Sequence, residues 1–194
     1  MADTKEICEK VVSALKKRKF DAYYVANSDE ARKKALELIP QGSCVSWGGS
    51  VSIAECGLLD AVKSGDYVLI DRDKAKTPEE KAEIMRRGLT CDTFLTSFNA
   101  VSEDGVLLNI DGNGNRVSAI AFGAKSVVAI VGANKIVPSE ADLENRALSV
   151  AAPLNAKRLN VEKVENICAI FVKTRMSLIP GRIKIIVVGE NLGY

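Results

Sequence analysis

The segment SWGGSVS places Gly48, Gly49 and Ser50 directly after an apolar run that is typical of a strand. Glycines let a ligand approach the backbone closely, and the free N–H groups at the start of a helix favour negative charge. A phosphate or a carboxylate would fit there. The alternative is a tight turn, with Ser52 and Glu55 forming a capping box for the helix itself. Because the segment lacks a Walker lysine and the GxGxxG spacing, both interpretations stay open.

The segment FNAVSEDGVLLNIDGNGNRV is dense in hydrogen-bonding side chains. Its candidate ligand-binding residues are Asn99, Glu103, Asp104, Gly105, Asp111, Gly112, Asn113, Gly114, Asn115 and Arg116, with Ser102 beside them. Asp-Gly and Asn-Gly pairs are also common in hairpin turns, which would explain the glycines without a ligand. An arginine directly after the turn, and polar side chains bordering apolar strands, favour a binding site, because pockets combine an apolar lining with a few polar groups.

Two further loops follow strongly apolar strands. In GANKIV, Asn134 and Lys135 come after the strand predicted at 127–131. Ligands of open α/β sheets bind beyond the carboxyl ends of strands, although a surface lysine at a strand exit is an equally good explanation. In GENLGY, Glu190 follows the last apolar strand, and a chain end explains this segment as well.

Carboxylates in these loops would be the acids, bases or nucleophiles of an enzyme, and Lys135 and Arg116 would hold an anion. The candidates are Glu55, Glu103 and Asp111, with Asp104 next to them. The alternative at each position is a solvated turn residue. The sequence contains no histidine, which excludes a Ser-His or Cys-His nucleophile pair and a His-ligated zinc.

Composition describes an ordinary globular chain, with 194 residues, 47% hydrophobic and 27% charged content. The net charge is only +2 and the signs are interspersed, so we expect no nucleic acid partner. Apolar runs fall short of the roughly 18 to 20 residues of a membrane span, and residues 1–10 lack the features of a secretion signal. We therefore expect a cytoplasmic protein without membrane contact. Its five cysteines, none in a CxxC pair, are expected to be buried thiols.

Helix and strand patterns alternate along the chain without an internal repeat. Helices are predicted at 4–20, 28–38, 50–63, 77–87 and 139–159. Strands are predicted at 23–26, 44–47, 67–70, around Phe94, at 106–110 and 127–131, and as a final strand pair at 168–172 and 183–188. This order predicts one α/β domain over residues 1–194, with an open, mostly parallel sheet and helices on both of its faces.

Several segments together resemble the lactate-utilisation (LUD) domain family, namely NAVSEDGVLLNIDGNGNRV, FGAKSVVAIVGANKIV, APLNAKRL and GRIKIIVVGENLGY. The segment GGSVSIAECGLLDAV is similar to the early glycine loop of the same family. The resemblance implies a fold similar to the sugar-phosphate isomerase and coenzyme A transferase group, in which glycine loops at strand ends bind phosphates or acyl carriers. It also implies a role in bacterial oxidation of L-lactate to pyruvate, beside iron-sulfur partner proteins.

Many members that resemble this chain carry a cysteine cluster, suggestive of metal or iron-sulfur binding, between the APLNAKRL helix and the last strands. Here that stretch, 160–183, is short and contains only Cys168. One thiol cannot supply the four ligands that a cluster ordinarily needs. Either this member has lost the cluster or the segment is missing, so we expect no cofactor or metal in this chain. Coenzyme A transferases use a glutamate nucleophile, which favours Glu103 by analogy.

Three functions follow from the loops and the resemblance. The first is an accessory protein of L-lactate oxidation, which binds a small anionic metabolite at the glycine-rich loops and works beside iron-sulfur lactate-oxidation subunits. The second is a stand-alone enzyme acting on a phosphorylated or coenzyme A-linked metabolite. The third is a ligand-sensing or structural domain. Small metabolic domains of this type are often dimers, so a homodimer is an expectation that composition does not measure.

Overall fold

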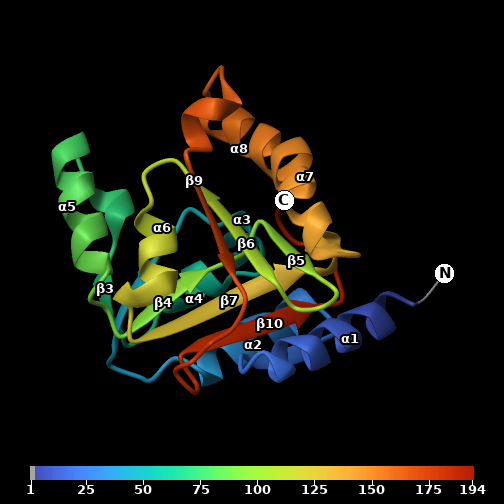
Figure 1. The fold of residues 1–194 in the computed structure, drawn as a ribbon. Helices are drawn as coiled ribbons and strands as arrows, with labels where there is room; N and C mark the ends of the chain where they lie inside the picture. Colours follow the sequence, from blue (N-terminus) through green and yellow to red (C-terminus); the bar gives the residue numbers. More distant parts are fainter. Residues whose placement is uncertain (1–2) are drawn as a thin grey trace.

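The computed structural model describes residues 3–194 and contains a six-stranded sheet in which every neighbouring pair of strands is parallel (Figure 1). Across the sheet the strands follow the order β1 Asp21–Val25, β10 Ile183–Val188, β7 Ser126–Gly132, β4 Thr93–Thr96, β2 Cys44–Trp47 and β3 Val68–Ile70. The prediction of an open parallel sheet is confirmed.

The central strands are apolar along their length because both faces of the sheet are covered. β7 reads SVVAIVG and β10 reads IKIIVV, and nearly all of their side chains are buried. Their register runs from Val127 opposite Ile183 to Gly132 opposite Val188. The carboxyl ends of the two strands therefore meet at the same edge of the sheet.

Helices pack on both faces of the large sheet. One face contacts α2 Ser28–Glu37, α3 Val51–Glu55 and α4 Leu58–Ser64, which contribute alanine, isoleucine, leucine and valine side chains. The opposite face contacts α1 Thr4–Lys17, α5 Pro78–Gly88 and the π-helical turn Ala119–Gly123 that continues α6 Asn115–Ser118. Side-chain caps begin the longer helices, because Asp3, Asn27 and Thr77 accept N–H bonds from α1, α2 and α5.

A second, smaller sheet lies beside the first on the α1 face, and the sequence patterns did not predict it. Its strands are ordered β8 Ile136–Val137, β5 Ala100–Ser102, β6 Leu107–Asp111 and β9 Ile170–Thr174. β5 and β6 form an antiparallel hairpin, and α7 Leu143–Arg146 packs on the side of this sheet that faces away from the large one. The small sheet thus separates α7 from the large sheet (Figure 1).

The final strand pair predicted at 168–172 and 183–188 is wrong as a pair. β9 joins β6 in the small sheet, whereas β10 lies between β1 and β7 in the large one. Both strands have suitable apolar content, but β9 is an edge strand with half-exposed side chains and β10 is central and buried. Nothing local to either strand specifies its partner, so only long-range packing separates them.

Three predicted helices differ from the observed ones. The helix predicted at 4–20 ends at Lys17, because Lys19 adopts a left-handed conformation and the chain turns into β1. The helix predicted at 50–63 is divided into α3 and α4 by Gly57, whose φ is +72°. The helical stretch predicted at 139–159 begins as a 3-10 turn, continues as α7, passes through a π-helical segment at Ala147–Ala151 and ends as α8 Ala152–Leu159.

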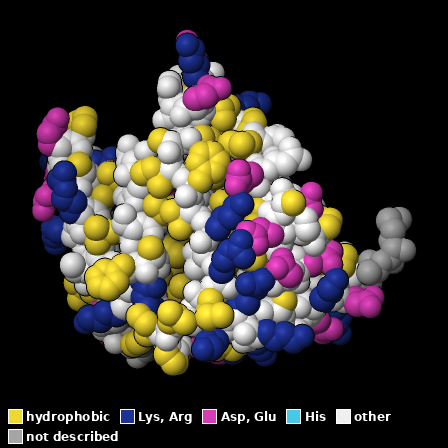
Figure 2. Space-filling model, in the orientation of Figure 1, with side chains coloured by type: hydrophobic (Ala, Val, Ile, Leu, Met, Phe, Trp, Pro, Cys, Tyr) yellow, Lys and Arg dark blue, Asp and Glu magenta, His cyan; other side chains and the backbone are white. Residues whose placement is uncertain are grey.

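Charged side chains of both signs lie intermixed over α1 and the small sheet on the face shown in Figure 2. Two ion pairs join these elements, one between Lys10 and Glu103 and one between Arg18 and Asp104. Within residues 3–194, no helix is both long enough and apolar enough to cross a membrane.

Candidate anion-binding site

A cavity of about 250 Å³ opens at the carboxyl edge of the large sheet. After β2 the chain enters α3 on one face of the sheet, whereas after the neighbouring strand β4 it continues into β5 on the other face. Such a divergence leaves a crevice above the strand ends, which is where open α/β sheets bind ligands. The position of the cavity therefore follows from the order of the strands.

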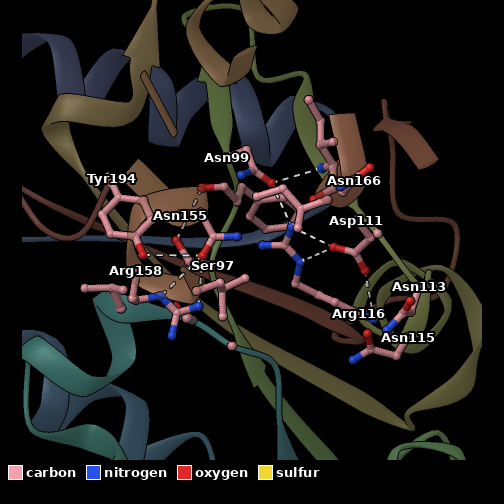
Figure 3. Close-up of a pocket in the computed structure, with 18 of the residues that line it drawn as sticks. Ser97, Asn99, Asp111, Asn113, Asn115, Arg116, Asn155, Arg158, Asn166 and Tyr194 are labelled. Atoms are coloured by element: carbon pink, nitrogen blue, oxygen red, sulfur yellow. Dashed lines mark hydrogen bonds and ion pairs between the residues drawn. The ribbon is translucent and has the colours of Figure 1, made fainter. Parts of the chain in front are cut away.

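Loops of both sheets, α8 and the last residue of the chain line this cavity (Figure 3). The lining residues are Gly49, Ser50, Val51, Arg72, Ser97, Phe98, Asn99, Ile110, Asp111, Gly112, Asn113, Asn115, Arg116, Lys135, Asn155, Arg158, Leu159, Asn166, Ile167 and Tyr194. Four of these side chains are basic, whereas Asp111 is the single acidic side chain in the set. The cavity therefore carries a positive charge suited to a small anion.

Arg116 is held rigidly at the cavity by its hydrogen bonds. Its Nε donates to Oδ1 of Asp111 at 2.7 Å, and its Nη2 donates to Oδ1 of Asn99 at 2.8 Å and to the carbonyl oxygen of Ile110 at 2.7 Å. The other oxygen of Asp111 accepts the backbone N–H groups of Arg116 and Val117 at 2.9 and 3.0 Å. Asp111 therefore serves two structural purposes, because it caps the start of α6 and orients the guanidinium.

Lys135 follows β7 and is buried at the cavity, with only 3% of the residue exposed. Its Nζ donates to Oγ of Ser52 at 2.7 Å and to Oγ of Ser97 at 2.9 Å. Burial lowers the pKa of this amine to about 7, and the positive charges of Arg146 and Arg116 act in the same direction. Near neutral pH, Lys135 therefore exists both as a cation, which a bound anion would stabilise, and as a neutral amine.

Arg72 comes just after β3 and has an unpaired donor, because its buried Nε has no hydrogen-bond partner among residues 3–194. Burial lowers the pKa of its guanidinium, and the carboxylate of Asp73 lies 3.8 Å from Nε. Gly49 leaves room for the Arg72 side chain, because a Cβ at Gly49 would lie 2.7 Å from Nη2 of the arginine. A buried donor without a protein acceptor is costly, so a ligand acceptor would stabilise it.

A third group of side chains comes from α8 and the last residue. The guanidinium of Arg158 donates from Nη2 to Oδ1 of Asn155 at 2.9 Å, and the hydroxyl of Tyr194 donates to the same oxygen at 3.4 Å. Figure 3 shows these three side chains at one end of the cavity, with Asn113 and Asn115 at the other end. The polar groups are therefore distributed around the cavity and could contact different parts of one ligand.

Many of the residues proposed from the sequence lie together at this cavity. They are Gly49, Ser50, Asn99, Asp111, Gly112, Asn113, Asn115, Arg116 and Lys135. Gly48 and Gly114 are not among the lining residues, but each is next to one in the chain. A Cβ at Gly48 would touch the Arg116 side chain at 3.3 Å, and Gly114 begins α6 with a φ of +78°.

Other proposed residues lie away from the cavity lining. Glu103, Asp104 and Gly105 belong to the β5–β6 turn, where both carboxylates pair with basic residues of the α1 region. The side chain of Asn134 binds the C-terminal segment, donating to the carbonyl oxygen of Gly193 at 2.9 Å. Glu190 accepts hydrogen bonds from the backbone N–H and the hydroxyl of Ser28. The polar groups of these residues are explained by structural contacts.

The capping box suggested for Ser52 and Glu55 is absent. Ser50 is the N-cap of α3 and accepts the N–H of Ile53 at 3.4 Å, which leaves the Ser52 hydroxyl to bind Lys135. Glu55 accepts the backbone N–H of Gly193 at 2.6 Å. The serine is thus part of the lysine site, and the glutamate holds the last residues of the chain.

Several lining residues were missed by sequence reasoning. They are Arg72, Ser97, Asn155, Arg158, Asn166 and Tyr194. Ser97 directly follows β4, so applying the strand-end rule there would have found it. The same rule would have found Arg72, which follows β3. Arg158 lies on a helix where basic residues are common, and no local pattern distinguishes it. Within residues 3–194, no group of three carboxylates or thiols is arranged to hold a metal ion.

The fold and the cavity together define a parallel α/β protein with a basic crevice where its strand connections diverge. The chain belongs to the LUD domain family, whose model matches residues 8–188. This family is associated with lactate utilisation. The resemblance seen in the sequence is therefore confirmed.

Solved structures agree with this fold. A DUF162 family protein from Deinococcus radiodurans is 14% identical, with 97% of this chain and 99% of that chain aligned at a TM-score of 0.57. eIF2B beta from Chaetomium thermophilum is 17% identical and has a lower TM-score of 0.42, over 59% of this chain and 44% of that chain. No curated protein matches the chain in sequence.

Proposed function

We propose that this protein binds a small carboxylate or phosphate compound in the basic cavity and acts as an accessory protein of L-lactate utilisation. The observation that carries the proposal is the set of three arginines and one lysine around a space of about 250 Å³, with one acidic side chain, that of Asp111, among them. That carboxylate is already bound to Arg116, so it does not neutralise Arg158. Arg72 has the Asp73 carboxylate 3.8 Å from its Nε, but this donor forms no hydrogen bond within residues 3–194. The remaining positive charge favours binding of an anion, and the volume of the cavity limits this anion to a small one.

Thermal shift is the direct test of anion binding. Purified protein is screened with lactate, pyruvate, inorganic phosphate, sugar phosphates, nucleotides and coenzyme A. A ligand at about a hundred times its dissociation constant adds roughly 2.7 kcal/mol of stability, which raises the melting temperature by several degrees. No shift with any of these anions would contradict the proposal.

Arg72→Gln is the variant that tests the site. It removes the guanidinium whose Nε has no partner among the described residues, so we expect binding to weaken about tenfold or more, which is roughly 1.4 kcal/mol or more. Arg86→Gln is the matched control, because the Arg86 side chain is 72% exposed on α5. Equal affinity of the two variants for the best anion would place the ligand elsewhere.

The accessory role rests on the family and on the surface around α8. Within the described chain, Leu148, Val150, Leu154 and Leu159 are exposed apolar residues of the helical stretch at 140–159, and Phe171 is exposed on the edge strand β9. A partner subunit would cover such side chains. Iron-sulfur subunits of lactate oxidation are the partners we propose, and co-purification from a lactate-grown bacterial host tests this. Recovery of the protein without those subunits would contradict the accessory role.

The alternative is a stand-alone enzyme acting on a phosphorylated or coenzyme A-linked metabolite. One observation favours chemistry at the cavity, namely a lysine amine that is buried there between two serine hydroxyls. Turnover of such a metabolite by the purified protein alone would favour the enzyme over the accessory role. The same observation supports the inference below.

A further inference from the structure

The hydrogen-bond partners of Lys135 differ in charge from those of Arg116 at the same cavity. Both hydrogen-bond acceptors of its Nζ are neutral hydroxyls, those of Ser52 and Ser97. Within residues 3–194, no carboxylate forms an ion pair with it, whereas Arg116 is paired with Asp111. A buried amine without a counter-ion is unfavourable as a cation, so its surroundings favour the neutral, nucleophilic form.

Three features of the position suit a nucleophile. The side chain lines the cavity, so a molecule bound there would lie beside this residue. Two hydroxyls hold Nζ at 2.7 and 2.9 Å, which limits its motion and leaves its lone pair available when it is neutral. Arginines on the same cavity would bind the charged group of a ligand and so orient its reactive part toward the amine.

We propose that Lys135 forms a reversible Schiff base with a small carbonyl compound whose carboxylate or phosphate group is bound by the arginines of the cavity. This inference rests on the proposed anion site and names its ligand class, an anionic aldehyde or ketone. Lysines that are desolvated in this way are known nucleophiles toward carbonyl carbons. Lys135 is then the reacting group, and Ser52 and Ser97 are positioning residues.

The step balances without any oxidant or cofactor. The lone pair of Nζ adds to the carbonyl carbon, a C–N bond forms, and one proton of the amine passes to the carbonyl oxygen to give a carbinolamine. The C–O bond then breaks, and the hydroxyl leaves as water with a second proton taken from the nitrogen. The product is an imine, and hydrolysis returns the free amine and the carbonyl compound. A hydroxyl beside Nζ is suited to relay these protons.

Reductive trapping tests the proposal on the intact protein. Protein is incubated at pH 7.5 with pyruvate, a 2-oxo acid, or with glyceraldehyde 3-phosphate, a phosphorylated aldehyde, and the imine is reduced with cyanoborohydride. Acetone serves as a carbonyl compound without an anionic group. We expect a single adduct whose mass is that of the carbonyl compound less one oxygen atom, and peptide mapping should place it on Lys135. Trapping of pyruvate alone or of the aldehyde alone identifies whether the anion is a carboxylate or a phosphate.

Two variants control the experiment. Lys135→Met should abolish the adduct, whereas Lys33→Met, which alters an exposed lysine of α2, should leave it unchanged. Peptide mapping of the unaltered protein keeps the test independent of whether Lys135→Met folds. Adducts spread over surface lysines, or equal trapping with acetone, would overturn the proposal.

The thermal-shift screen separates failure of this inference from failure of the proposed function. Stabilisation by lactate or phosphate without any adduct from pyruvate or the aldehyde would overturn the Schiff base and leave the anion site standing. Absence of both stabilisation and adduct would overturn the two together. Stabilisation with an adduct on Lys135 supports both.

Discussion

Burial has a larger effect than any neighbouring charge on the protonation of Lys135. The pKa of its amine falls from 10.5 to about 7, chiefly because the cation is removed from water, with Arg146 and Arg116 adding to the effect and Glu55 opposing it. The hydroxyls of the two serines accept its hydrogen bonds but bring no negative charge. A lysine of this kind changes its charge near neutral pH, which an exposed lysine does not.

This pKa has a consequence for stability that can be measured. Between about pH 7 and pH 10.5 the unfolded chain binds more protons at this residue than the folded chain, so the free energy of unfolding should rise with pH across that window. Below about pH 7 both states are protonated and the contribution should be constant. Thermal melts of the wild type and Lys135→Met at several pH values isolate the effect. A constant difference between the two proteins from pH 7 to 10 would contradict the lowered pKa.

Asp111 is the residue whose loss should damage the cavity most. Asp111→Ala would leave the guanidinium of Arg116 without its carboxylate and remove the cap of α6, and breaking such a buried pair costs about 3–5 kcal/mol. Urea unfolding measures the change. Glu83→Ala is the control, because its exposed pair with Arg86 should contribute less than about 1 kcal/mol. Equal effects of the two substitutions would mean that Asp111 is not structural.

Glu103, which analogy with coenzyme A transferases suggested as a nucleophile, does not lie at the candidate site. Its carboxylate pairs with Lys10 of α1, and the residue does not line the cavity. We expect Glu103→Gln to keep the thermal shift produced by the best anion and to change stability by less than about 1 kcal/mol. Binding measured by calorimetry checks this. Loss of anion binding in this variant would mean that Glu103 is part of the binding site after all.

At the scale of elements, the β5–β6 turn joins the small sheet to α1. Gly105 allows this, because its φ is +85° and a Cβ there would lie 2.9 Å from the backbone carbon of Ala14. The hairpin can therefore pack directly on the helix backbone. In contrast, Gly42 has a φ of +71°, and a Cβ there would meet open space, with no neighbouring atom within 4 Å.

This pair of glycines separates backbone strain from close packing. Gly42→Ala should cost about 1–2 kcal/mol, the penalty of a left-handed conformation for a residue with a Cβ. Gly105→Ala should cost at least about 1 kcal/mol more, because α1 or the hairpin must also move. Free energies of unfolding from urea titrations give the comparison. If both substitutions have the same effect, the contact between the turn and α1 is not tight.

At the scale of the whole molecule, the cavity joins parts of the chain that are distant in sequence. Loops after β2, β3, β4 and β7 come from the large sheet, Asp111 and Arg116 come from the small sheet and its following helix, and α8 closes one end. An anion that contacts several of these groups would couple the two sheets. Ligand binding should therefore slow hydrogen exchange in segments that belong to different helices and strands.

Hydrogen exchange tests this coupling. With saturating pyruvate or inorganic phosphate, whichever raises the melting temperature, we expect slower exchange in the loops at 48–52, 97–99 and 111–117 and in α8. The β5–β6 turn should exchange at an unchanged rate, because it lies outside the cavity lining. Protection limited to one loop would indicate a site smaller than the cavity.

The amino-acid pattern alone was sufficient to predict the positions of most helices and strands. β2 and β10 were predicted with their observed bounds, and β7 was predicted to within one residue at each end, because a strand buried on both faces must be apolar along its length. The helix predicted at 77–87 is observed as α5 at Pro78–Gly88, and Thr77 is its N-cap, with a side chain that accepts the N–H of Glu80. Such signals depend on residues close in sequence, so they can be read without the fold.

The site was accessible to sequence reasoning only where it follows a strand or a glycine turn. Gly49, Asp111 and Lys135 meet that condition, and they lie at one cavity. Arg72 follows β3 and meets the condition too, although it was not predicted, whereas Arg158 on α8 does not meet it. Neither the convergence of these residues nor the burial of Lys135 has a local signature. The order of the strands, the separate small sheet and the charge state of the lysine were decided by tertiary structure, because each depends on contacts between residues far apart in the chain.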